Sequence, residues 1–334
     1  MTNTFLRSVS PMAASGAAAA ALMLGLLAAP ICAQRVTVPD SGERTLQLFD
    51  LQDLGPASNA PSATLAAAAQ NAARFLRQFV EPKLRDGDDL TSVGEHWLAA
   101  FADSERLAAV EQLLAVAKDH RNDQMTVEIR LCEISAKAFD ETIRGLLGKQ
   151  AGGDGQAGEE PETSRTNRPL EAMIPKGNAA AFLEVCAESS DGWLAAPIVA
   201  LGALQRATIE TVRTVPYVRD FEVERVGDAA VADPVIDTAW DGLKSSMTAT
   251  FLPGGLVGVE CRLQLQELQN PMPKAEVEVL AGAPLATIQL PRATGITLQS
   301  TAELQPGSLL VLASKRQSGG YLLAAVRADV ITPR

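Results

Sequence analysis

The chain has 334 residues and a formal net charge of −11 at pH 7. This excess of acids excludes nucleic acid as a partner, because binding a phosphate backbone requires clustered Lys and Arg side chains. Hydrophobic residues make up 47% of the chain and aromatic residues only 4%, so we expect an aliphatic core. The length suits two domains, or one domain with an elongated module beside it.

The start of the chain combines one basic residue with a short apolar run. Arg7 precedes an Ala-rich stretch and the apolar residues 21–27. This order is typical of a secretory signal peptide, and the run is shorter than the about 20 residues that a membrane-spanning helix needs. We therefore predict a cleavable signal peptide over residues 1–33. Lipidation of Cys32 is disfavoured because the residue before it is the bulky Ile31.

Residues 34–90 are predicted to hold one strand and one helix. Residues 45–49 alternate between apolar and polar side chains, which predicts a strand. Apolar residues then recur at three- and four-residue steps from Leu65 to Phe79, which predicts a helix. The acidic segment 86–89 lacks the ligand spacing of a calcium loop and is interpreted as a solvated turn.

An α/β module is predicted over residues 91–147. A strand pattern over residues 94–102 precedes a helix over 104–119, for which Asp103 is the expected N-cap. Residues 125–133 then alternate strictly, with apolar side chains inward and Thr, Glu and Arg outward. Strand, helix and strand would form a small α/β unit.

Residues 148–169 are rich in Gly, Asp, Glu, Thr, Ser and Arg and show no apolar periodicity. This composition predicts a flexible insertion. Its acidic residues Glu159, Glu160 and Glu162 are interpreted as solubilising charge, because catalytic carboxylates need a rigid, partly buried setting.

Residues 170–334 are predicted to be mainly antiparallel β-structure after one short helix at 179–187. Strand patterns occur at residues 207–211, 221–224, 247–251, 257–265, 285–290, 296–304, 309–313 and 321–331. The Pro-Gly-Gly segment 253–255 predicts a hairpin between two of these strands. The fold class predicted for the chain is therefore α+β.

No motif in the sequence carries a recognisable catalytic chemistry. The chain lacks a G-x-S-x-G elbow, an H-E-x-x-H motif and a C-x-x-C pair. His120 is expected to cap the C-terminus of a helix, and His96 has no nucleophile near it in the sequence. We predict no catalytic, cofactor-binding or metal-binding residues, and a protein that is not an enzyme.

Three acids fall at four-residue spacing, which would align them on a helix. They are Asp233, Asp237 and Asp241. Pro234 and Gly242 favour a loop instead, so a metal site is not predicted there.

Three cysteines follow the predicted signal peptide, at a wide spacing that matches no metal-ligand pattern. Cys132 and Cys261 lie within strand patterns and are interpreted as buried thiols. A disulfide that involves Cys186 stays open.

The order of these segments resembles the C-terminal domain of the bacterial secretin family. Residues 125–134 resemble the strand that enters this domain from a ring-forming α/β module, with Glu133 at an acidic position of the family pattern. The later strands that resemble the family's series are residues 193–201, 205–210, 217–218, 247–259 and 304–313. Two features depart from the family: Ala313 and Ser314 replace a paired Gly, and the Pro- and Gly-rich segment that follows it is missing.

The resemblance implies a small ring-building-like α/β module followed by a mainly antiparallel β secretin-like domain over residues 170–334. Secretins form homo-oligomeric barrels in the outer membrane, to which each subunit contributes strands. The resemblance thus implies a non-enzymatic homo-oligomer of the periplasm or outer membrane. It would contribute to a protein-secretion or pilus channel, or to a scaffold without a pore, with other secretion-system or pilus envelope components as partners.

Two other classes of protein remain open at this point. The first is a monomeric periplasmic binding or adaptor module in which the sheet edges are covered. The second is an extracytoplasmic hydrolase that uses the dispersed residues Asp233, Asp237 and His96.

Overall fold

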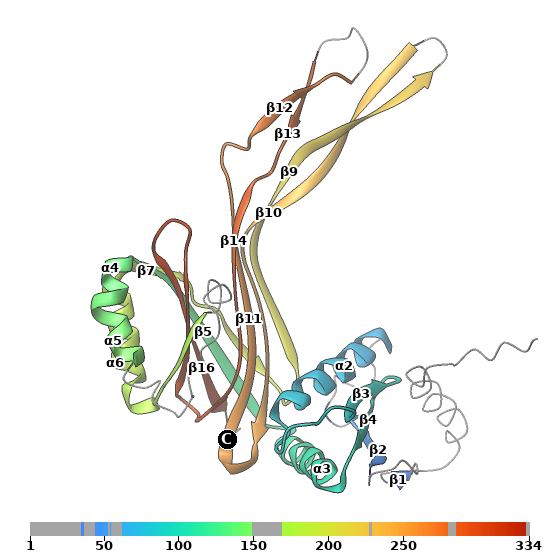
Figure 1. Ribbon diagram of the computed structural model, residues 1–334, viewed down its shortest axis with the longest axis vertical. Helices are drawn as coiled ribbons and strands as arrows, with labels where there is room; N and C mark the ends of the chain where they lie inside the picture. Colours follow the sequence, from blue (N-terminus) through green and yellow to red (C-terminus); the bar gives the residue numbers. More distant parts are fainter. Residues whose placement is uncertain are drawn as a thin grey trace, which may run out of the picture.

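The computed structural model describes residues 35–36, 44–52, 54, 62–148, 169–226, 229–279 and 285–331. The expected signal peptide lies outside these residues, and so does the predicted insertion apart from its first and last residue. The described residues form an α+β fold with antiparallel sheets, which confirms the predicted fold class. Two long hairpins extend far from the body of the molecule (Figure 1).

The N-terminal unit packs two helices against a four-stranded sheet of order β1-β2-β4-β3. Its elements are β1 (Arg35–Val36), β2 (Thr45–Asp50), α2 (Ser62–Phe79), β3 (Asp89–Val93), β4 (Trp97–Ala102) and α3 (Ser104–Asp119). Asp103 caps α3 as predicted, because its carboxylate accepts the backbone N–H of Arg106 at 3.0 Å. The helix buries the apolar stripe that its sequence indicates.

The two strands of the predicted α/β unit lie in different sheets, which corrects that expectation. β4 pairs with β2 and β3, whereas β5 (Gln124–Ile134) pairs along its whole length with the C-terminal strand β16 (Tyr321–Ile331). The alternation within β5 is as predicted, and its inward residues are buried. Alternation shows which side of a strand is buried, but it does not identify a partner so distant in the sequence.

The second sheet forms the centre of the body, with the order β6-β15-β16-β5-β7 and with β8 also paired to β5. Its further strands are β6 (Leu170–Ile174), β7 (Ser190–Ala195), β8 (Ile198–Leu201) and β15 (Leu309–Lys315). One face is covered by the helical segments α4 (Ala136–Ala138), η2 (Phe139–Ile143), α5 (Arg144–Gly148) and α6 (Lys176–Glu188) (Figure 1). Residues 193–201 were expected to form one strand. They belong instead to the two short strands β7 and β8, which Pro197 separates.

The third sheet has the order β14-β11-β10-β9 and packs against the opposite face of the second sheet. Its strands are β9 (Arg206–Val226), β10 (Ala229–Leu252), β11 (Leu256–Leu268) and β14 (Ala293–Leu304). The predicted Pro-Gly-Gly hairpin joins β10 to β11 through the short helical turn η4 (Pro253–Gly255). A small ribbon of β12 (Lys274–Val277) and β13 (Ala286–Gln289) continues the β11–β14 hairpin (Figure 1).

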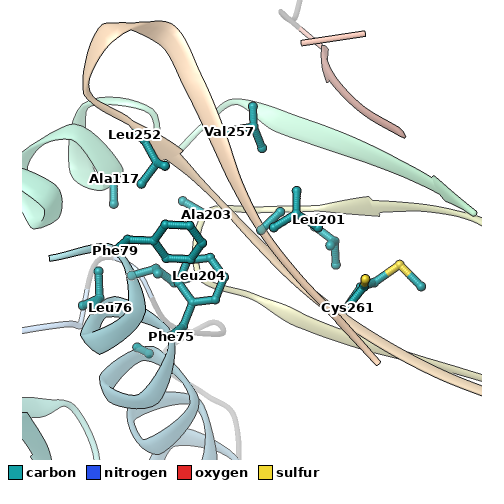
Figure 2. Close-up of a cluster of buried hydrophobic side chains, with 14 of the residues drawn as sticks. Phe75, Leu76, Phe79, Ala117, Leu201, Ala203, Leu204, Leu252, Val257 and Cys261 are labelled. Carbon is teal, nitrogen blue, oxygen red and sulfur yellow. The ribbon is translucent and has the colours of Figure 1, made fainter. Parts of the chain in front are cut away.

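The largest apolar core joins the N-terminal helices to the base of the third sheet. Figure 2 shows Phe75 and Phe79 of α2 close to Leu252 at the end of β10. The centroids of the two phenylalanine rings are 4.6 Å apart. A Cβ on Gly258 of β11 would lie 3.0 Å from the Phe79 ring, so glycine lets the helix approach the sheet closely.

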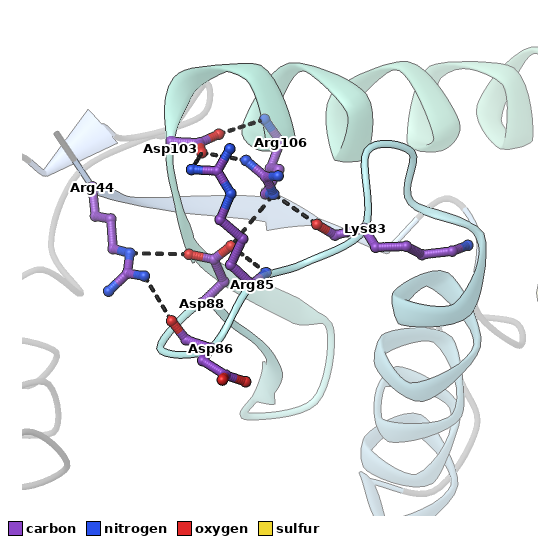
Figure 3. Close-up of polar contacts among 7 residues, drawn as sticks. All are labelled: Arg44, Lys83, Arg85, Asp86, Asp88, Asp103 and Arg106. Atoms are coloured by element: carbon purple, nitrogen blue, oxygen red, sulfur yellow. Dashed lines mark hydrogen bonds and ion pairs between the residues drawn. The ribbon is translucent and has the colours of Figure 1, made fainter. Parts of the chain in front are cut away.

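Residues 86–87 form the predicted turn and are exposed, but the side chain of Asp88 is buried in ion pairs, which the interpretation as a solvated turn did not include (Figure 3). The Asp88 side chain is only 1% exposed and lies 3.0 Å from Nε of Arg44 and 3.5 Å from Nε of Arg106. Arg44 also donates a hydrogen bond to the carbonyl of Asp86 at 2.7 Å. These contacts tie the segment before β2 to the start of α3.

Across the part of the chain that the structure describes, no helix is long and apolar enough to cross a membrane.

Candidate assembly surface

A two-stranded arm extends beyond the rest of the third sheet (Figure 1). β9 pairs with β10 along its whole length, but β11 pairs with β10 only as far as Gly242. Residues 212–226 and 229–241 therefore form a ribbon two strands wide, which we call the arm. At about 3.3 Å per residue the arm is roughly 40 Å long.

At positions 212–224 and 231–241, charged residues occupy only one side of the arm. Directly paired residues of an antiparallel ladder share a side, and neighbours along a strand alternate between sides. By this register, every charged residue at positions 212–224 and 231–241 lies on the same side, which we call the charged side. The residues are Arg213, Arg219, Asp220, Glu222, Glu224, Asp233, Asp237 and Asp241.

A β-bulge at Arg219 keeps these charges together. The ladder is regular up to the pair of Val218 and Ile236 and resumes at Asp220, which leaves Arg219 without a partner strand residue. The Arg219 guanidinium lies 3.4 Å from the carboxylate of Asp237, on the charged side. In β9 the charged residues have odd numbers up to Arg219 and even numbers from Asp220 onward. The extra residue of the bulge shifts the alternation by one position, so the charges before and after it lie on the same side.

The opposite side of the arm holds no charged residue over the same positions, and we call it the apolar side. Its members are Val212, Thr214, Pro216, Val218, Phe221, Val223, Ala232, Pro234, Ile236, Thr238 and Trp240. Ile236 is 65% exposed and Val223 is 44% exposed. Large apolar side chains gathered on one exposed side are typical of a contact surface.

The charged side carries more acid than base. Arg213 pairs with Asp241 at 2.9 Å, and Asp237 accepts a hydrogen bond from the Tyr217 hydroxyl at 3.4 Å besides its pair with Arg219. Four acids of the arm form no ion pair with any residue whose side chain the structure describes: Asp220, Glu222, Glu224 and Asp233. The charged side is therefore acidic toward the tip of the arm.

The edges of the arm offer unpaired main-chain groups. β9 is the outermost strand of its sheet. Residues 229–241 of β10 pair only with β9 among the described strands. One group on the β9 edge is used locally, because the N–H of Val218 donates to Oε1 of Gln289 on β13 at 3.0 Å. A two-stranded ribbon is marginally stable alone, and free edges are templates for further strands.

Arg316 joins the arm-bearing sheet to the central sheet. It follows β15, and its guanidinium pairs with Glu133 of β5 and with Glu267 of β11. The Arg316 side chain is only 12% exposed. A surface pocket of about 540 Å³ lies beside it, between the β15–β16 turn and the upper ends of β11 and β14. Glu133, the acidic position of the secretin resemblance, is thus part of this joint.

The acidic triad of the sequence lies in a strand, so the expectation of a loop is wrong. Asp233, Asp237 and Asp241 all belong to β10, and Pro234 and Gly242 are paired within the same ladder. Residues four apart on a strand are separated by about 13 Å, which is too far to share a metal ion. Within the described ranges, no group of three or more His, Cys, Asp or Glu residues could hold one.

The histidines are not brought together with these acids. His120 is the C-cap of α3 as predicted, its ring stacks on Phe251 at 4.3 Å, and its Nδ1 lies 2.7 Å from Asp123. The His96 ring lies 5.2 Å from the ring of Trp97 in the N-terminal unit.

The cysteines are fully buried, which confirms the interpretation of Cys132 and Cys261. Burial raises the pKa of Cys132 to about 12 and that of Cys261 to about 12. The pKa of Cys186 is raised first by burial and second by the neighbouring Cys132 thiol.

Sequence reasoning missed the arm itself. It identified residues 207–211, 217–218 and 221–224 of β9 as strand but not as one continuous strand, and it placed residues 233–242 of β10 in a loop. The change in charge parity between positions 219 and 220 is the signal that would have identified the bulge and hence one continuous strand.

The comparisons with known proteins return secretin structures. No protein-family model and no curated protein matches the chain. Among solved structures, the chain is similar to the type II secretin GspD from enteropathogenic Escherichia coli, at 11% identity, with 87% of this chain and 88% of that chain covered and a TM-score of 0.31. It is similar to the secretin domain of InvG from Salmonella at 7% identity, with 88% of this chain and 89% of that chain covered and a TM-score of 0.31. It is also similar to the type IV competence pilus secretin PilQ from V. cholerae at 12% identity, with 95% of this chain and 82% of that chain covered and a TM-score of 0.26.

Proposed function

We propose that the chain assembles with copies of itself into a ring-shaped channel or scaffold of the bacterial cell envelope, which serves protein secretion or pilus assembly. The observation that supports this most is the arm, in which the charges at positions 212–224 and 231–241 all lie on one side and most of the outer main-chain edges pair with no further described strand. If neighbouring arms pair through their edges, the apolar sides join into one surface and the charged sides into the opposite one. The function is non-enzymatic.

The third sheet has a free edge at each end, β9 and β14, among the described strands. Pairing the β9 edge of one copy with the β14 edge of the next is a head-to-tail contact, and such contacts close into rings when the rotation permits. In the proposed assembly the apolar side faces the lipid of the outer membrane and the acidic charged side lines the passage. The partners would be secretion-system or pilus envelope components, reached after export by the expected signal peptide.

Val223 and Val231 offer a matched pair of substitutions. Both lie near the tip of the arm, and they are 44% and 46% exposed. Val223 is on the apolar side, whereas Val231 pairs directly with Glu224 on the charged side. A new carboxylate therefore meets an apolar surface in Val223→Asp and an already acidic one in Val231→Asp.

The test is the size of the chain extracted with mild detergent, measured by native chromatography and by electron microscopy of the same fractions. We expect rings for the unmodified chain and for Val231→Asp, and small species for Val223→Asp. An unmodified chain that remains a monomer would refute the proposal. Equal loss of assembly in both variants would refute the role of the apolar side.

One observation favours a second candidate, a monomeric periplasmic adaptor. The β12–β13 ribbon lies against β9, and Gln289 occupies the N–H of Val218, so part of the β9 edge is already covered. A monomeric adaptor predicts the same small size for the unmodified chain and both valine variants. Sedimentation of the three proteins distinguishes the two functions.

A further inference from the structure

Two of the three described cysteines belong to the same buried cluster. Cys132 lies in β5 and Cys186 lies in the last turn of α6, and both side chains are fully buried. They share the apolar cluster between the central sheet and the helices that cover it. Cys261 belongs to the other core, at the base of the third sheet.

The chain path brings the two thiols near one another. Four residues after Cys186 the chain enters β7 at Ser190, which pairs with Ile134, two residues beyond Cys132 in β5. The helix α6 itself packs directly against β5. The Cys132 thiol is the second cause, after burial, of the raised pKa of the Cys186 thiol.

We propose that Cys132 and Cys186 form a disulfide bond when the chain folds in the presence of a disulfide oxidant such as oxidised glutathione. Two S–H bonds break and one S–S bond forms between the cysteines. The two electrons and two protons pass to glutathione disulfide, which is cleaved to two glutathione thiols. Cys261 remains a free thiol, since the cluster around it contains no second cysteine among the described residues.

The bond would fasten α6 to the central sheet beneath the arm. It would enclose residues 133–185, a long loop that includes the predicted insertion. Cross-linking a long loop stabilises a protein mainly by restricting its unfolded chain. The expected export of the chain would deliver it to a compartment in which such bonds persist.

The test is refolding of the full chain from denaturant in a glutathione redox buffer, followed by alkylation under denaturing conditions and peptide mapping by mass spectrometry. We expect the peptides that contain Cys132 and Cys186 to be linked and to have lost two hydrogen atoms together, with Cys261 alkylated. Addition of dithiothreitol should lower the thermal midpoint by roughly 5 °C or more.

Cys132→Ala and Cys186→Ala should each abolish the link and the effect of dithiothreitol, whereas Cys261→Ala should retain both. Free, alkylatable Cys132 and Cys186 after oxidative refolding would overturn the proposal, as would a link from either of them to Cys261. If an alanine variant does not fold, the peptide map of the unmodified chain decides alone. The map does not depend on assembly, so a monomeric chain would refute the proposed ring and leave this test unaffected.

Discussion

Arg219 and Asp237 pair at 3.4 Å on the charged side of the arm, at the position where the ladder between β9 and β10 is interrupted. Arg219 is the extra residue of a bulge, so the charges at positions 213–224 of β9 change from odd to even numbers and still lie on one side. With Arg219 present, the separation of the two sides of the arm therefore depends on the bulge, which accommodates this residue outside the ladder.

Deleting Arg219 should leave this separation intact. Val218 and Asp220 would become neighbours in an uninterrupted ladder, and each would keep its present side. The lost ion pair is exposed, so we expect the free energy of unfolding to change by no more than about 1 kcal/mol, measured by urea denaturation. The large species should persist in native chromatography.

Deleting Val215, within the regular part of the ladder, is the control. A one-residue shift there turns the charges of one half of β9 toward the apolar side, so the large species should be lost. Equal assembly of the two deletions would contradict the role of the bulge.

The sequence predicts strands well where one side of a strand is buried and poorly in the arm. Residues 257–265 alternate because their inward side chains enter the core, and they form part of β11 as expected. In the arm no core imposes alternation, and Pro234 and Gly242 resemble the ends of a strand. The pairing of β5 with β16 is a contact between distant segments, which local patterns do not contain.

The helical segment over residues 136–148 was also missed. Its buried residues Phe139, Ile143 and Leu147 recur at steps of four, which is the available helical signal. The segment combines a short α-helix, a π-helical turn and a second short α-helix, so no stretch of it is long enough to show a full amphipathic period.

Arg316→Met should destabilise the joint between the central and third sheets. The substitution retains an apolar stem and leaves the carboxylates of Glu133 and Glu267 without their shared cation. These carboxylates are 42% and 49% exposed, so solvent screening limits the expected loss to about 1 kcal/mol. Urea denaturation measures it, and added salt should reduce the difference from the unmodified chain.

The control for this joint is Arg262→Met. Arg262 is exposed on β11 and forms no ion pair within the described residues, so the expected change is within about 0.5 kcal/mol. Identical losses in the two variants would mean that Arg316 does not join the sheets.

Asp103→Ala should weaken the N-terminal unit in a pH-dependent way. The pKa of Asp103 lies below its ordinary value of 3.8, first because the backbone N–H of Arg106 donates to its carboxylate, and also because of the Arg106 side chain. A carboxylate with a lowered folded pKa stabilises the fold above its unfolded pKa, and this contribution is lost as the pH falls through the folded pKa. We expect a loss of about 1 kcal/mol at pH 7 that shrinks below pH 3.8, measured by circular dichroism.

Asp119→Ala, at the other end of the same helix, is the matched control. Removing an acid from a helix C-terminus should be neutral or slightly stabilising. A loss for Asp103→Ala that is independent of pH would show that the capping carboxylate is not its source.

Gly242→Ala should disrupt the point at which the arm leaves the four-stranded part of its sheet. Gly242 has a φ of 129°, a conformation that residues with a side chain rarely adopt. An added Cβ would overlap the carbonyl oxygen of Thr211 and lie 3.0 Å from Cα of Val212, and backbone atoms of a paired strand cannot move aside. We expect the free energy of unfolding to fall by about 2 kcal/mol or more in urea denaturation, with faster amide exchange in residues 231–241.

The control is Gly295→Ala, in β14 of the same sheet. Its Cβ makes only an ordinary contact of 3.7 Å with the Leu265 carbonyl, so the substitution should lower the stability far less. Equal stability of the two variants would contradict this backbone conformation at the base of the arm.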